Sequence, residues 1–320
     1  MKPPHGQKPG GSGRPPVNRG PNPAGGGSST RLTLGVGQQD PRARDQRGPR
    51  PQGAQPLQQR SDGPRRDGQR PRQIDAPRPS PDTPKGAVWL YGFHAVAAAL
   101  ANPQRRLRRL VVTEEAEATL AQMQAQPWPL QAERTDRGRV DHLLGRDIAH
   151  QGVALLADPL AQSSLASVLE RKGPIVVLDQ VTDPRNVGAI MRSAAAFGAA
   201  AVIVQDRNAP EETGSLAKAA SGTLETMPLL RAVNIARTLI ALKAANVWCV
   251  GLDASGKPLS GPFYTGRRVA LVLGSEGEGM RRLTRETCDD IAGLSIKGAV
   301  ESLNVSAAAA VALYELTRSA

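Results

Sequence analysis

Three segments of the chain combine glycine with side chains that can bind a ligand, and each borders a strand-like apolar run. The first, DQVTDPRNVGAIMRSA at residues 179–194, runs from a strand into a helix. Asp183 is a common turn residue, Asn186 tolerates unusual backbone angles, and Gly188 permits close packing, so none of the three requires a ligand. Arg192 is not explained in this way, because it falls on a helix that must pack on a sheet. A guanidinium there could bind a phosphate or a carboxylate through two parallel hydrogen bonds.

The second segment, RRVALVLGSEGEGM at residues 267–280, is a strand that ends in a glycine-rich turn. The turn carries Glu276 and Glu278 and has no following Lys-Ser/Thr pair, and its glycines do not match G-x-G-x-x-G. It is therefore neither a phosphate-binding loop nor a dinucleotide fingerprint. Two carboxylates suit a ligand with positive charge and hydroxyl groups, bound through the exposed backbone of the turn.

The third segment, LSIKGAVESLNVSAAAAVALYE at residues 294–315, is expected to pass from a short strand through a loop containing Gly298 into a long helix. Ser302, Asn304 and Ser306 stand at the start of that helix. Serine and asparagine are ordinary N-cap residues, so capping alone could explain them. Their occurrence with the other two segments favours a shared ligand site.

From residue 173 onward, buried strands alternate with helices. Continuous apolar runs such as IVVLDQV, AAVIVQD and RRVALVLG are typical of strands buried on both faces. The runs GAIMRSAAAFG, ETGSLAKAASG, NIARTLIALKAAN and MRRLTRETCDD have helical patterns. This alternation predicts a mostly parallel sheet covered by helices on both faces, and such sheets bind ligands beyond the carboxyl ends of their strands.

The chain changes composition near residue 86. Residues 1–86 hold 16 Lys+Arg and 6 Asp+Glu, a net +10 of the whole chain's +12, and contain no Phe, Trp or Tyr. We expect a disordered basic tail that either holds RNA phosphates non-specifically or serves only for solubility. Residues 87–157 are expected to form a small α/β domain, residues 158–172 a linker with a short helix, and residues 173–320 the main α/β domain.

Several classes are disfavoured by what the sequence lacks. The longest apolar runs fall short of the roughly 20 residues of a membrane span, and neither a secretory signal nor a transit peptide is indicated. Cys249 and Cys288 lack zinc-ligand or disulfide spacing. His94 and His150 also lack metal-ligand spacing and are expected to serve in packing or turns. We therefore expect a cytoplasmic protein without a metal.

Taken together, the three segments resemble the three sequence motifs of the SpoU/TrmH family of RNA ribose 2′-O-methyltransferases, within the SPOUT class. The resemblance extends more weakly to YGFHAV and HQGVAL, which are similar to the substrate-binding domain of the bacterial 23S rRNA guanosine-2′-O-methyltransferase subgroup. It implies a C-terminal trefoil knot that holds S-adenosylmethionine (SAM), a homodimer, and a guanosine of 23S rRNA as the substrate.

The positions of the motifs also imply roles for individual residues. SAM contacts are implied for Gly274, Leu294 and Leu303. Catalytic roles are implied for Asn186, Arg192, Glu276, Ser302 and Asn304. The implied reaction is an in-line transfer of the SAM methyl group to a ribose 2′-hydroxyl, which loses its proton as it attacks. Because guanidinium stays protonated in proteins, we favour the arginine as an electrostatic clamp on the RNA phosphate and the developing alkoxide, although the family is often described with this arginine as the base.

Outside the motifs, two basic segments have alternative interpretations. Lys218, Ser221 and Gly222 resemble a segment that lines the same region, but a surface helix is the simpler explanation. Four arginines could face rRNA or form a charged helix–strand junction: Arg105, Arg106, Arg108 and Arg109.

Three other functions compete with 23S rRNA methylation. A tRNA 2′-O-methyltransferase is the nearest, and the small domain argues against it only by resemblance. A non-catalytic ribosome- or RNA-binding factor is disfavoured because all five implied catalytic residues are present. An NAD-binding oxidoreductase is disfavoured because the glycine fingerprint and its acidic ribose-binding residue are missing.

Overall fold

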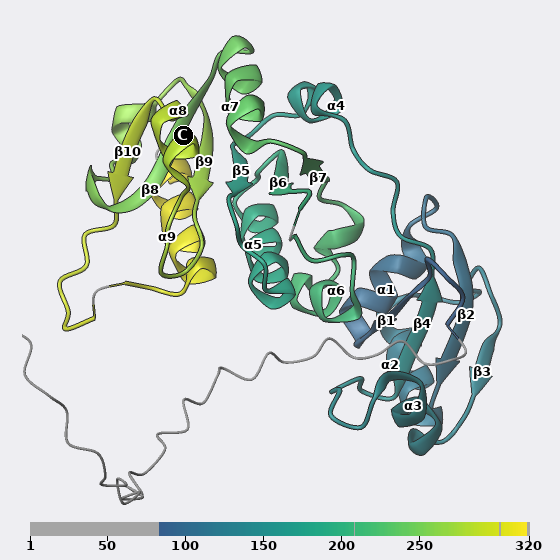
Figure 1. The fold of residues 1–320 in the computed structure, drawn as a ribbon. Coiled ribbons are helices and arrows are strands. Elements are labelled where there is room, and N and C mark those ends of the chain that lie inside the picture. Colours follow the sequence, from purple (N-terminus) through teal and green to yellow (C-terminus); the bar gives the residue numbers. More distant parts are fainter. Residues whose placement is uncertain (1–82, 208, 301, 319–320) are drawn as a thin grey trace, which may run out of the picture. The chain divides into compact units, whose positions relative to one another are not determined.

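Residues 83–207, 209–300 and 302–318 are described by a computed structural model (Figure 1), and they fall within one structural unit. The tail predicted for residues 1–86 lies outside the described residues except for residues 83–86.

Residues 88–157 hold a four-stranded sheet of order β1-β4-β2-β3. Its pairs β1–β4 and β2–β4 are antiparallel, and β2–β3 is parallel. The strands are β1 (Val88–Tyr91), β2 (Leu107–Val112), β3 (Ala132–Arg134) and β4 (Val153–Ala157). Helices α1 (Phe93–Ala101) and α2 (Glu114–Met123) contribute to the core on one side of this sheet, and α3 (Arg137–Leu144), which the sequence did not predict, to the core on the other.

A six-stranded sheet follows, with order β10-β8-β9-β5-β6-β7. Every pair of neighbouring strands is parallel. The strands are β5 (Ile175–Leu178), β6 (Ala201–Gln205), β7 (Leu229–Ala232), β8 (Val247–Pro258), β9 (Arg268–Leu273) and β10 (Asp290–Gly293). The expectation of a mostly parallel sheet is therefore confirmed.

Helices cover both faces of this sheet. Successive side chains of a strand point to opposite faces, so Val176 and Leu178 pack with one group of helices while Ile175 and Val177 pack with the other. The first group is α5 (Pro184–Ala196), α6 (Gly214–Ala220) and α9 (Val305–Thr317), and the second includes α4 (Leu165–Glu170) and α7 (Ile235–Ala244), against which α8 (Arg282–Thr287) also packs. The described residues also form two short 3-10 helices: η1 (Thr223–Glu225) and η2 (Gly261–Tyr264).

Helix α5 occupies the middle of its face and contacts both α6 and α9. It begins at the Asp183 cap, whose side chain accepts a hydrogen bond from the backbone N–H of Arg185 at 2.8 Å. A Cβ atom at Gly188 would lie 2.5 Å from the carbonyl oxygen of Leu216, so only glycine permits the close approach of α5 and α6.

Residues 294–304 connect β10, at one edge of the sheet, to α9, which packs on the central helix α5. The chain therefore returns from the edge to the middle of the sheet through the third of the three segments (Figure 1). The trefoil knot implied by the resemblance stays a prediction.

Two expected elements differ from the structure near β8. The helix expected over residues 280–290 is confined to α8, because Asp289 Oδ2 accepts a hydrogen bond from the backbone N–H of Cys249 at 2.9 Å and Asp290 Oδ2 accepts one from Trp248 Nε1 at 2.6 Å. These hydrogen bonds hold the residues that follow α8 against β8, where they form β10. The strand expected at Leu294 therefore ends one residue earlier, at Gly293.

Candidate functional site

The three segments singled out in the sequence meet through side-chain hydrogen bonds. Glu276 Oε1 accepts from Asn304 Nδ2 at 2.7 Å, from the backbone N–H of Val305 at 3.2 Å and from Asn186 Nδ2 at 3.3 Å. Asn304 Nδ2 also donates to Asn186 Oδ1 at 3.1 Å. We call Asn186, Glu276 and Asn304 the loop junction. It joins residues that lie up to 118 positions apart in the chain.

Local structure explains why each member of the loop junction can reach the others. Asn186 lies in the first turn of α5, directly after β5, and Glu276 lies in the turn after β9. Asn304 is the N-cap of α9, and its Oδ1 accepts from the backbone N–H of Ser306 at 2.9 Å. Because β5 and β9 are neighbouring parallel strands, their carboxyl ends and the turns that follow lie together. Capping and ligand-site formation, which the sequence left as alternatives for Asn304, are compatible roles of one side chain.

The glycine-rich turn is held tightly at its base. A Cβ atom at Gly274 would lie 2.0 Å from the carbonyl carbon of Gly279, and the backbone of Ser275 and Gly279 forms two hydrogen bonds of 3.1 Å. Gly277 and Gly279 have φ values of 95° and 71°, which suit glycine. The turn therefore presents bare backbone beside the carboxylate of Glu276, as expected for a site that binds a cationic ligand bearing hydroxyl groups.

The implied SAM contacts surround the same edge of the sheet. Leu294 packs partly against the core directly after β10, while Leu303 precedes the cap of α9 and is 39% exposed. Gly274 directly follows β9. SAM combines a sulfonium charge, ribose hydroxyls and an apolar purine, and this set of bare backbone, carboxylate and leucine side chains fits those three features.

Two of the implied catalytic residues stand apart from the loop junction. Arg192 is exposed and makes no hydrogen bond or ion pair with any described residue. It follows Asn186 by six residues on α5, which places the two side chains about 120° apart around the helix. Ser302 is exposed and likewise has no hydrogen-bond partner in the described part of the chain. Both side chains are thus available to a ligand.

An ion pair that the sequence analysis did not assign holds two of the three segments together. The carboxylate of Asp179, at the end of β5, is fully buried and accepts from the backbone N–H of Arg281 at 2.9 Å and from Arg281 Nε at 2.8 Å. This pair ties the first segment to the end of the glycine-rich turn. The sequence signal that could have indicated this pair is an aspartate at the end of an apolar run together with an arginine just after the glycine-rich turn.

A second pair steadies β8 where it departs from regular pairing with β10. Asp253 Oδ2 lies 2.8 Å from Arg285 Nη1, and Asp253 Oδ1 accepts from the backbone N–H of Ser255 at 2.9 Å. The register of β8 against β10 shifts here, between Ile291 and Ala292. The hydrogen bonds from Ser255 and the nearby guanidinium lower the pKa of the Asp253 carboxyl below its ordinary value.

The other basic residues considered in the sequence take structural positions. Arg105 is buried between carboxylates, so the expectation that it could face rRNA is wrong, because its guanidinium has no access to solvent. The remaining three arginines of this group make ion pairs with acidic residues: Arg106 and Arg108 with Asp158, and Arg109 with Glu133. These ion pairs are those expected of a charged junction, and the Arg106 side chain remains 80% exposed.

Lys218 lies on α6 and contacts residues of the substrate-binding segment. Its ammonium donates to the carbonyl oxygen of Ala149 and sits 5.9 Å from the centre of the Tyr91 ring. His150 is fully buried; its Nε2 lies 2.8 Å from Asp141 Oδ1 and its Nδ1 accepts from the backbone N–H of Gly152 at 3.0 Å. This histidine therefore has the turn and packing role that the sequence predicts.

Among the described residues, no helix is long and apolar enough to cross a bilayer, and no group of three or more His, Cys, Asp or Glu side chains could hold a metal ion.

Comparison with known proteins places the chain in a family. Residues 173–314 match the SpoU rRNA Methylase family, and residues 89–163 match the domain described as RNA 2′-O ribose methyltransferase substrate binding. The chain is 39% identical over 249 residues to the 23S rRNA (guanosine-2′-O-)-methyltransferase RlmB of Photobacterium profundum, with 72% of this chain and 96% of the relative covered. It is 42% identical over 242 residues to the RlmB of Ralstonia nicotianae, with 72% and 94% covered.

Solved structures agree in fold. A crystal structure titled RNA 2′-O ribose methyltransferase has 25% identity and a TM-score of 0.59, with 73% of this chain and 88% of that chain covered. The SpoU methyltransferase AviRb from Streptomyces viridochromogenes, solved in complex with AdoMet, has 23% identity and a TM-score of 0.61, with 73% and 90% covered.

The chain therefore belongs to the SpoU rRNA methylase family of RNA 2′-O-methyltransferases, in the SPOUT class. The family and the α/β fold with a mostly parallel sheet, both expected from the sequence, are confirmed.

Proposed function

We propose that this enzyme methylates the ribose 2′-hydroxyl of a guanosine in 23S rRNA. The observation that carries the proposal is the loop junction, where Asn186, Glu276 and Asn304 bring three distant segments together at the carboxyl edge of the sheet. The substrate is supported by relatives at 36–42% identity that are named for this nucleotide and this RNA.

In this proposal the chain holds SAM through the bare backbone at Gly274 and the side chains of Leu294 and Leu303. When bound there, SAM supplies an electrophilic methyl group. Glu276 faces the cationic cofactor with its carboxylate and keeps the glycine-rich turn fixed to α5 and α9 through the loop junction. The protein's contribution is thus to hold a fixed geometry before the RNA arrives.

Arg192 and Ser302 act on the RNA. Both are exposed and without partners among the described residues, so neither needs to break an existing interaction to bind a phosphate or a ribose. The guanidinium of Arg192 clamps a phosphate and stabilises the negative charge that develops on the attacking 2′-oxygen. It does not take the proton, because an arginine stays protonated.

The small domain captures the rRNA, and the enzyme is a homodimer. Helix α9 exposes two large apolar side chains, Val311 at 47% and Tyr314 at 56%, and the Tyr314 ring contacts Phe197 edge to face at 6.1 Å between centroids. An exposed apolar patch on a helix suits the self-complementary interface of a two-fold dimer. Because its substrate is rRNA, we place the enzyme in the cytoplasm.

The test is methyl transfer from labelled SAM to total RNA from a strain that lacks the gene, followed by mapping of the labelled nucleotide. Label on a guanosine 2′-oxygen of 23S rRNA is the expected result. Label in tRNA would retain the chemistry and overturn the substrate. No label in any RNA, with no SAM binding, would favour the non-catalytic binding factor instead.

The role of Arg192 is tested by Arg192→Ala. We expect methyl transfer to be lost while the Kd for SAM stays within a few-fold, since the clamp acts on RNA. The matched control is Arg237→Ala, which removes the same charge from an exposed position on α7, on the opposite face of the sheet. An equal loss of SAM affinity in Arg192→Ala would contradict the assigned role.

Residues 1–86 are proposed to strengthen RNA binding through their net charge of +10. Their removal should weaken RNA binding and reduce its dependence on salt concentration, with no change in kcat at saturating RNA. RNA affinity that does not change on removal would assign this segment no part in binding.

A further inference from the structure

A buried arginine joins the small domain to the methyltransferase domain. Arg105 lies between α1 and β2, and its side chain is 0% exposed. Its partners come from beyond the linker: Glu212 precedes α6, and Glu225 lies in η1. Both belong to the SpoU methylase segment, whereas Arg105 belongs to the substrate-binding segment.

The guanidinium of Arg105 is almost fully used in this cluster. Its Nε and Nη2 donate to the two oxygens of Glu225 at 3.1 and 2.5 Å, and its Nη1 donates to Glu212 Oε1 and to the carbonyl oxygen of Asp158 at 2.9 Å. A planar, bidentate arrangement of this kind fixes orientation as well as distance. Burial acts to lower the pKa of Arg105, but the hydrogen bonds and charges of Glu225 and Glu212 outweigh it and raise that pKa.

The same two carboxylates also hold the linker and the end of α1. Glu212 Oε2 accepts from the backbone N–H of Leu160 at 3.0 Å, and Glu225 Oε2 accepts from Asn102 Nδ2 at 2.8 Å. Four separate segments of the chain therefore meet at Arg105. We call Arg105, Glu212 and Glu225 the interdomain clamp.

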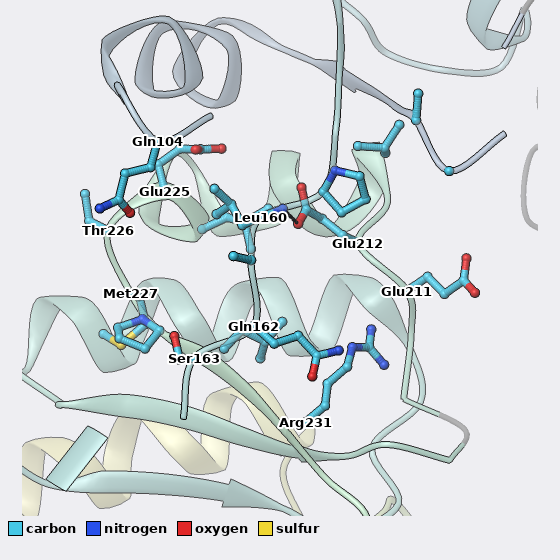
Figure 2. A pocket seen from close by; sticks show the side chains of 18 of the residues that line it. Gln104, Leu160, Gln162, Ser163, Glu211, Glu212, Glu225, Thr226, Met227 and Arg231 are labelled. Carbon is cyan, nitrogen blue, oxygen red and sulfur yellow. Dashed lines mark hydrogen bonds between the residues drawn. The ribbon is translucent and has the colours of Figure 1, made fainter. Parts of the chain in front are cut away.

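A cavity lies beside the clamp. It measures about 910 Å³ and is lined by Gln104, Glu212, Glu225 and linker residues 159–163 among others. Figure 2 shows Glu212 and Glu225 on the wall of this cavity, near Leu160 and Gln104. The linker runs along this open cavity, and the clamp holds it there through the hydrogen bond from the backbone N–H of Leu160 to Glu212.

The domains are also in close contact at Gly214, two residues after Glu212. A Cβ atom at Gly214 of α6 would lie 2.4 Å from the carbonyl oxygen of Trp89 and 2.3 Å from the ring of Tyr91. The clamp adds directed hydrogen bonds to this packing contact between the domains.

We propose that Arg105 is a positioning residue, which sets the orientation of the small RNA-binding domain towards the loop junction by clamping Glu212 and Glu225. A buried ion pair is weak as a source of stability but precise in geometry, so its role is orientation. The proposal rests on the proposed function, in which the small domain captures RNA and the loop junction faces the ribose. Misplacement of a bound substrate by about 1 Å can cost on the order of 100-fold in rate.

The experiment compares Arg105→Gln with Arg106→Gln in the full-length chain. The control removes the same charge one residue away, from a side chain that is 80% exposed. Dyes on Gln122→Cys and Ala241→Cys, exposed positions of α2 and α7, report the distribution of distances between the domains. The parallel measurements are kcat/KM for unmodified 23S rRNA and the Kd for SAM.

For Arg105→Gln we expect a broader distance distribution and a fall in kcat/KM for RNA of about 10- to 100-fold, with a Kd for SAM within twofold of the parent. Arg106→Gln should match the parent in all three. A distance distribution that does not change, or one that broadens without loss of kcat/KM, overturns the proposal.

Should Arg105→Gln lose SAM binding through misfolding, the neutral variant Arg105→Met with Glu212→Gln and Glu225→Gln replaces it, because it leaves no buried charge unpaired. For this variant too, a distance distribution that does not change, or one that broadens without loss of kcat/KM, overturns the proposal. If the parent enzyme methylates no RNA, the proposed function fails, and the distance distributions still decide whether the clamp orients the domains.

Discussion

Replacing Asn304 by aspartate separates the two roles of this side chain. The Oδ1 atom of Asn304 caps α9 by accepting from the backbone N–H of Ser306, while its Nδ2 atom donates to Glu276 and Asn186. Aspartate retains the acceptor and is an equally good N-cap. It has no donor, and it places a second carboxylate where Nδ2 lies 2.7 Å from Glu276 Oε1.

The expected cost follows from these contacts. Loss of a hydrogen bond to a charged acceptor costs about 1.5–3 kcal/mol, and two unit charges about 4 Å apart in water repel by about 1 kcal/mol. Because the loop junction is exposed to solvent, we take the total free-energy cost as about 2–4 kcal/mol. This cost disfavours the closed form, in which Asn186, Glu276 and Asn304 are hydrogen-bonded to one another, relative to an open form without these bonds. Each 1.4 kcal/mol is tenfold, so the closed form becomes roughly 30- to 1000-fold less populated relative to the open one.

Single-turnover methyl transfer at saturating RNA and SAM should fall in Asn304→Asp by about that factor, divided by any excess of the closed over the open form in the parent. Thermal unfolding should hardly change, because the cap remains. Asn304→Ser keeps the cap without adding charge and should lose less activity. Asn304→Ala loses the cap and should lower Tm the most, by about 2–4 °C for a cap worth about 1 kcal/mol.

The order of the three variants is the decisive result. Aspartate should be worst in methyl transfer and alanine worst in Tm. Activity of Asn304→Asp within twofold of the parent, or alanine and aspartate variants that melt at the same temperature, would refute the separation of junction and cap.

The remaining predictions concern the surroundings of the site. Gly274→Ala should weaken SAM binding at least tenfold, because its Cβ would lie 2.0 Å from backbone, whereas Gly298→Ala, with nothing within 4 Å, should bind SAM normally in calorimetry. Burial raises the pKa of both Cys249 and Cys288 to about 12, so neither thiol should react with iodoacetamide at pH 8 in the folded protein, and both should react after denaturation, as mass spectrometry would show. The pKa of Asp253 is lowered by folding, chiefly through the hydrogen bond from the serine two residues on, so this carboxylate adds stability above its unfolded pKa of about 4 and loses it as pH falls through its lower folded pKa. In chemical denaturation Asp253→Asn should accordingly be less stable than the parent at pH 7, and the difference should shrink below about pH 4.

Local sequence determined the elements that carry the site. The apolar runs at Ile175–Leu178 and Arg268–Leu273 are short, continuous and rich in β-branched residues, so they indicate strands buried on both faces without any knowledge of the fold. The capping residues Asp183 and Asn304 mark the starts of α5 and α9 for equally local reasons. The three motifs, and with them the family, were thus accessible from residue types and spacing.

Tertiary structure alone decided which charges serve the ligand and which serve the fold. Arg105 and Arg192 are the same residue type, yet one is enclosed by Glu212 and Glu225 and the other is exposed without a partner among the described residues. Ion-pair partners 107 and 120 positions away cannot be read from a local pattern. The same holds for the hydrogen bonds of Glu276, because they depend on β5 and β9 being neighbours in the sheet and on α9 returning from its edge. A chain specifies its strands and caps through neighbouring residues, but side chains meet across the fold only after those elements have packed.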